Sequence, residues 1–146
     1  MAGYKYKLQN ILKLRESIEK DKKNEFGVAT QRLDKEKLKL KQLNAEMYNM
    51  CDSIEKAVSK GIKCNELLVQ HQFKNYYKGC ISDQTIKSQM AEEHLTYCRQ
   101  KLVVAVQDRK IMEKLKEIDF EKYKYTEQKI EEKLVDDLVS FKHSNK

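Results

Sequence analysis

The sequence predicts an all-α protein, a long antiparallel two-helix coiled-coil hairpin whose C-terminal helix overhangs its partner. None of the 146 residues is proline, the commonest helix breaker, and 36% of them are charged. Apolar residues recur at alternating steps of three and four, a spacing that keeps one narrow stripe facing a neighbouring helix. In the first half of the chain Glu36 interrupts this stripe, which consists of Phe26, Ala29, Leu33, Leu40, Leu43, Met47, Met50, Ile54 and Ala57.

The first helix is expected over about residues 4–57, and the chain is expected to reverse at residues 58–64. Gly61 suits the position just after a helix, where a left-handed backbone is common. Asn65 suits the N-cap of the next helix, because its side chain can accept a hydrogen bond from an amide one turn later. Gly79 is the other weak point in the helical pattern, and we expect it to be a bend inside the second helix.

The second helix is expected over about residues 65–141. Folding about Gly61 pairs the N-terminus with residues near Glu117, so about 25 to 30 residues of the second helix would overhang without an intrachain partner. An unpaired amphipathic helix favours a second protein, and a disordered charged tail is the alternative. Apolar spacing continues along this helix, first at Leu95, Cys98, Leu102, Ala105, Met112 and Leu115, and later at Ile130, Leu134, Leu138 and Phe141.

The whole chain, residues 1–146, is expected to form a single coiled-coil domain. A parallel dimer of straight helices is the alternative arrangement. Gly61 and the polar stretch from Glu19 to Glu25 would interrupt the continuous contact that such a dimer needs, whereas a hairpin uses the glycine as its turn.

Charge is concentrated in two stretches. The net charge is +7, and Lys5–Lys23 and Arg99–Glu117 carry +4 and +3 of it, so the remainder of the chain is neutral. In a hairpin these stretches lie side by side, which predicts an electropositive region that attracts an acidic partner. Nucleic acid is the alternative, but acidic residues are mixed into both stretches and weaken a phosphate-binding surface.

Several function classes lack sequence support. The chain has no glycine-rich phosphate loop and no nucleophile motif, and a two-helix hairpin offers no enclosed pocket, so we expect no enzyme and no cofactor. The four cysteines and three histidines show no metal-binding spacing, so we expect reduced thiols and no metal site. No apolar run spans a bilayer and no secretory signal begins the chain, so a cytoplasmic location is expected.

Two segments resemble the flagellar FliJ family. Tyr6 to Glu16 (YKLQNILKLRE) is similar to the start of the family's first helix. Ala105 to Glu117 (AVQDRKIMEKLKE) is similar to an Arg-Lys-x-x-Glu-x-Leu-x-Glu segment in the family's second helix. Chain length, absence of proline and the turn glycine agree with this resemblance, which covers nearly the whole chain.

The resemblance implies a non-enzymatic component of the flagellar type III protein export apparatus. Members resemble the central stalk of rotary ATPases: they insert into the ring of the export ATPase FliI, promote ring assembly and link the ring to the export gate protein FlhA. Some bind export chaperones. This implies a role in motility and a peripheral position at the cytoplasmic face of the inner membrane, reached through partners. The equivalent stalk of a virulence-type secretion system has the same architecture and stays open.

The resemblance also implies two sets of binding residues. Candidates for contact with the export ATPase combine the matched motifs with the start of the overhang: Arg15, Glu16, Arg109, Lys110, Glu113, Lys116, Phe120 and Tyr123. Candidates for contact with the export gate lie nearer the turn and are Leu43, Met50, Phe73, Tyr77, Cys80 and Gln84. Leu43 and Met50 also belong to the apolar stripe, so packing against the second helix is the alternative role for them, and it is open for Phe73 and Tyr77 too.

Overall fold

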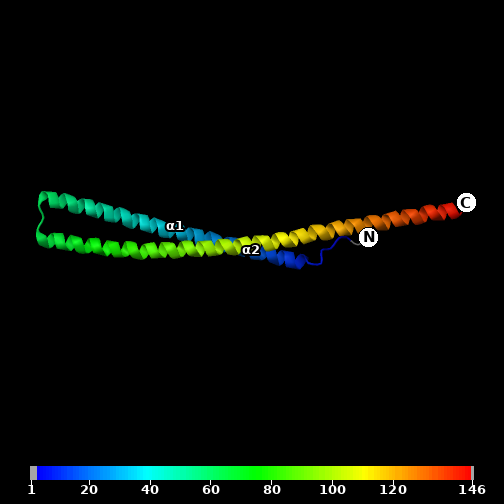
Figure 1. Ribbon diagram of the computed structural model, residues 1–146, viewed down its shortest axis with the longest axis horizontal. Helices are drawn as coiled ribbons and strands as arrows, with labels where there is room; N and C mark the ends of the chain where they lie inside the picture. Colours follow the sequence, from blue (N-terminus) through cyan, green and yellow to red (C-terminus); the bar gives the residue numbers. More distant parts are fainter. Residues whose placement is uncertain (1–2, 146) are drawn as a thin grey trace. The chain divides into compact units, whose positions relative to one another are not determined.

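The computed structural model describes residues 3–145, and over this range it contains two helices and no strand. Helix α1 (Gln9–Lys60) has 52 residues and helix α2 (Cys64–Ser144) has 81. A short turn joins them (Figure 1). The predicted all-α helical hairpin is therefore confirmed. Neither helix, within the described range, has a stretch long and apolar enough to cross a membrane.

Gly61 makes the reversal between the two helices. Its φ angle is 89°, and its N–H donates to the Val58 carbonyl at 3.2 Å, so it has the left-handed backbone predicted for it. Asn65 is not the N-cap, because α2 already begins at Cys64 and the first i to i+4 bond runs from the Leu67 N–H to the Lys63 carbonyl at 3.1 Å. Helix α2 continues through Gly79.

Helix α1 begins at Gln9, later than the expected start near residue 4. Residues 3–8, which we call the N-terminal segment, are not helical apart from a turn closed by the Gln9 N–H on the Tyr6 carbonyl at 3.2 Å. The Tyr6 hydroxyl lies 3.4 Å from the carbonyl oxygen of Met112 on α2. Tyr4 and Tyr6 both contact α2 from this non-helical segment, whose backbone covers more distance per residue than a helix does.

The chain divides into two compact units, each containing part of both helices. Unit 2 is Lys22–Leu102, and unit 1 combines Met1–Asp21 with Val103–Lys146. In unit 2, every residue of the predicted apolar stripe of α1 is buried or half-buried. On α2 a run of buried and half-buried positions in this unit again follows steps of three and four, through Tyr77, Ile81, Gln84, Ser88, Ala91, Leu95, Cys98 and Leu102. We call the two facing stripes the seam.

The seam of unit 1 uses charged residues more heavily. Leu12 and Ala105 are buried there, and Met112 is half-buried. Leu115, expected on the stripe, is 43% exposed, and Lys116 occupies the seam position instead. The reason is the coiled-coil period: the step after Met112 is four residues, and a lysine can pack its aliphatic stem in the seam while its ammonium reaches a polar partner.

The C-terminal part of α2 in unit 1 lies beyond the paired region. From residue 124 to residue 145 every side chain is exposed except that of Glu127, which is half-buried. Because the N-terminal segment contacts α2 as far as Tyr123, the overhang consists of residues 124–145 within the described chain.

Candidate binding surfaces

The N-terminal segment packs on α2 through Tyr4. The Tyr4 hydroxyl donates to a carboxylate oxygen of Asp119 at 2.9 Å, and its ring lies 5.0 Å from that of Phe120 and 5.2 Å from that of Tyr123, between centroids. Loss of water and the hydrogen bond to Asp119 raise the pKa of Tyr4 to about 12. Phe120 and Tyr123 were expected in the unpaired overhang, and this expectation was wrong, since both have an intrachain aromatic partner.

Arg109 is held between two carboxylates in unit 1. It pairs with Glu19, which is only 6% exposed, and with Glu113, whose Oε1 lies 2.7 Å from Nη1 of Arg109. The bond to Glu113, followed by that to Glu19, raises the pKa of Arg109 further above its usual value. Nearby, Arg15 pairs with Asp108 at 3.4 Å. Both arginines predicted to contact the ATPase are therefore engaged within the chain.

Four other predicted ATPase-binding residues meet around one groove. Lys116 contributes its half-buried stem, and its Nζ donates to Oε1 of Gln9 at 2.9 Å. The groove encloses about 520 Å³ and has both apolar and charged walls, so a partner's apolar side chain could enter it beside charged groups. Lys110 is exposed. The predicted residues that line the groove are Glu16, Glu113, Lys116 and Phe120, and the others are Tyr4, Leu12 and Glu117.

The overhang exposes a series of large apolar side chains. Ile130, Leu134, Leu138 and Phe141 follow steps of four, four and three, so they lie on one side of α2. Each is about half exposed or more. These steps place eleven residues in three helical turns, which is nearer to the period of a straight α-helix than the seven residues in two turns of the seam. The overhang therefore presents an unpaired apolar face.

The predicted gate-binding residues do not form one accessible surface in unit 2. Gln84 is buried in the seam, where its side-chain amide donates to the main-chain oxygen of Glu36 at 3.0 Å and to the Glu36 carboxylate. The bond from Gln84 is the main cause that lowers the pKa of Glu36. Leu43, Met50, Tyr77 and Cys80 are half-buried, whereas Phe73 is 56% exposed.

Phe73 belongs instead to an exposed surface that the sequence interpretation missed. Val69, Phe73 and Tyr76 succeed one another at steps of four and three on α2, and all three are exposed. With Gln72 they line a hollow of about 290 Å³. The spacing could have revealed this surface, but a second stripe on one helix is recognised only once the seam residues, such as Tyr77, have been located.

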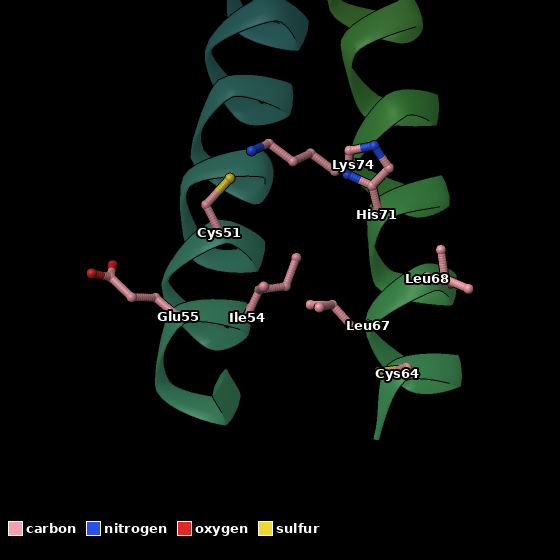
Figure 2. A pocket seen from close by; sticks show the side chains of 8 residues that line it. All are labelled: Cys51, Ile54, Glu55, Cys64, Leu67, Leu68, His71 and Lys74. Atoms are coloured by element: carbon pink, nitrogen blue, oxygen red, sulfur yellow. The ribbon is translucent and has the colours of Figure 1, made fainter. Parts of the chain in front are cut away.

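A larger cavity lies beside the turn in unit 2. It measures about 560 Å³, and Figure 2 shows Ile54 of α1 and Leu67 of α2 pointing toward one another across it, with Glu55 and Leu68 directed outward. Cys51, Cys64, His71 and Lys74 complete its lining. All four cysteines are free, and the described residues contain no group of three or more His, Cys, Asp or Glu side chains that could hold a metal ion.

A hairpin of two helices that pack along a seam of three- and four-residue steps places the protein in the class of helical coiled-coil proteins. Within that class the chain belongs to the family described as Flagellar FliJ protein, whose model matches residues 4–146. The resemblance predicted from the two sequence segments is thereby confirmed. The chain is accordingly a component of the flagellar protein export apparatus. No curated protein and no solved structure matches it.

Proposed function

We propose that the protein is a non-enzymatic stalk that promotes assembly and activity of the ring-shaped export ATPase and links that ring to the export gate. The observation that carries the proposal is the overhang, an exposed apolar helix face that follows the groove around Lys116 and Phe120 along α2 in unit 1. A rod-like end that enters a ring can contact several subunits at once, so weak contacts add through effective concentration and favour the closed ring. Binding to the export ATPase and the export gate would place the protein at the cytoplasmic face of the inner membrane.

The overhang is tested by measuring ATP hydrolysis by an export ATPase of the FliI type from the same source. Truncation should start after Tyr123, because an earlier cut would remove the partners of Tyr4. We expect the protein lacking residues 124–146 to keep its helicity in the paired region and to lose stimulation. Full stimulation by the truncated protein would contradict the assignment of the overhang.

Two matched double variants test whether stimulation depends on the apolar face of the overhang or on the overhang as a whole. Leu134→Ser with Leu138→Ser removes two exposed apolar side chains four residues apart. Glu132→Ser with Asp136→Ser makes changes at the same spacing on the opposite side of α2. We expect the first pair to reduce stimulation at least about tenfold, as loss of interface anchors does, and the second to leave it nearly unchanged.

For the export gate, the proposed contact surface is Phe73 with its neighbours Val69 and Tyr76, because all three side chains are exposed. Phe73→Ala should weaken binding to the cytoplasmic part of an FlhA-type protein without changing the melting temperature, since Phe73 is largely exposed. Tyr77→Ala should lower the melting temperature, because Tyr77 occupies the seam. Gate binding unaffected by Phe73→Ala would remove Phe73 from the proposed surface.

A further inference from the structure

A second apolar stripe lies on α2 in unit 1, outside the seam and before most of the overhang. Val104, Ile111, Ile118 and Tyr125 are exposed and recur every seven residues. Leu115, also exposed, lies between the two isoleucines. We call these five residues the outer stripe. Met90 and Tyr97 have the same spacing but belong to unit 2, and the inference does not depend on them.

The outer stripe cannot be an extension of the contact with α1. Val104 and Ile111 directly precede the seam residues Ala105 and Met112, and one residue turns a helix by about 100°. The side chains of the stripe therefore lie outside the seam, to one side of it. A strict seven-residue repeat also keeps a stripe at a constant angle to a coiled-coil axis, which is the condition for lasting contact with a further helix.

The surface around the outer stripe is hollowed and positively charged. Ile118 and Tyr125 line a hollow of about 670 Å³, whose other walls are two lysines, two glutamates and a threonine: Lys114, Lys122, Glu117, Glu121 and Thr126. Among the exposed residues of 104–125, four are lysines, at positions 110, 114, 122 and 124, and two are glutamates, at positions 117 and 121. Both glutamates already pair with lysines, at 3.3 Å and 3.8 Å. Lys110 and Lys122 are left over, so the exposed face has a net charge of +2 and favours a partner with acidic side chains beside its apolar ones.

We infer that the outer stripe binds an amphipathic helix of a partner protein, one whose apolar residues recur at steps of three and four and are flanked by Glu or Asp. The stripe covers three heptads, long enough for a partner helix to gain order by packing. A second copy of this chain would bring two positive faces together, and a nucleic-acid backbone would leave the apolar side chains in water. The inference goes beyond the proposed function, since it names a further partner. The stripe borders the groove around Lys116 at Glu117 and reaches the overhang at Tyr125, but Ile111 and Ile118 belong to neither the groove nor the overhang.

The test uses the full-length protein and two synthetic helical peptides. Both have leucines at steps of three and four over four heptads; one carries Glu at the flanking positions and the other carries Lys. Each is labelled and used below the concentration at which it self-associates, and binding is followed by fluorescence anisotropy. We expect the Glu peptide to bind at least about tenfold more tightly than the Lys peptide, with a preference that falls as salt is added.

Two double variants determine where the peptide binds. Ile111→Ser with Ile118→Ser changes the outer stripe, at side chains that are 57% and 43% exposed. Leu14→Ser with Ile11→Ser changes α1 of the same unit, at 57% and 42% exposure, and serves as the matched control. The stripe variant should lose affinity at least about tenfold and the control less than about twofold, with equal helicity by circular dichroism.

Three results would overturn the inference. The first is equal loss of affinity in the stripe variant and the control, which would mean that the peptide binds elsewhere. The second is equally tight binding of the two peptides, which would remove the role of charge. The third is a wild-type dimer in sedimentation equilibrium that becomes a monomer in the stripe variant, which would identify a second copy as the occupant. ATPase stimulation and gate binding are measured separately, so the proposed function can fail without affecting this result.

Discussion

Gly61 is the residue on which reversal of the chain depends. It is the one described residue with positive φ, and the space where a Cβ would stand is empty. Glycine is therefore required at this position for its backbone conformation, and not because a side chain would collide with its neighbours. Gly79 also has open space around it, but it lies inside α2 with helical geometry. The two glycines have the same surroundings and opposite conformational demands.

Replacing these glycines by alanine should change stability in opposite directions. Gly61→Ala should lower the free energy of unfolding by about 1 kcal/mol, because an L-residue is strained in the left-handed region. Gly79→Ala should raise it by about 0.5 to 1 kcal/mol, because alanine loses less backbone entropy in a helix. Urea titration followed by circular dichroism measures both. A shift of the same sign in both variants would show that the turn conformation is not what Gly61 provides.

The N-terminal segment acts at the scale of an element, since it determines how much of α2 in unit 1 is paired. Its Tyr4 reaches Asp119, Phe120 and Tyr123, all beyond the Lys116 that Gln9 contacts. The few residues of this non-helical segment thus cover about two turns of α2. A helical N-terminus with the same number of residues would be shorter and would cover less of α2. The boundary of the overhang is therefore set by the segment before α1.

Hydrogen exchange should show this boundary directly. We expect slow exchange of α2 amides up to about residue 123 and faster exchange beyond it, because an unpaired helix end frays. Tyr4→Ala should speed exchange at residues 116–123 severalfold. Tyr125→Ala, which also removes an aromatic ring but one exposed on the overhang, should leave those amides unchanged. If exchange at residues 116–123 were indifferent to Tyr4, the segment would have no role in pairing.

At the scale of the whole molecule, the sequence predicted what depends on one helix at a time. The stripe from Phe26 to Ala57 and the turn at Gly61 follow from local spacing and backbone preference, and both predictions are confirmed. Features that depend on a partner across the seam were not predicted. Glu36 was recognised as an interruption, but its partner Gln84 was interpreted as part of a gate surface. The hydrogen-bond partner of a carboxylate on the other helix can be identified only once it is known which residues of the two helices face each other.

The candidate sites show the same division. The motif residues Arg15 and Arg109 were predicted to contact the export ATPase, and each is paired with a carboxylate of the opposite helix. The groove that unites Glu16, Glu113 and Lys116 needs contributions from both helices and the N-terminal segment, so no spacing along one helix could predict it. The exposed apolar residues of the overhang, in contrast, were named from sequence alone, because no partner residue is involved.

The seven-residue period of the seam on both sides of the Gly61 turn also limits how chain length can vary in evolution. In unit 2 the seam residues of α1 and α2 count outward from Gly61 in steps that add up to seven, so insertion of one residue in either arm rotates everything beyond it by about 100°. Insertions or deletions should therefore be tolerated when seven residues are gained or lost in α1 and seven in α2. Relatives of different length are expected to differ by multiples of about fourteen residues between the paired ends, with unrestricted variation only in the overhang.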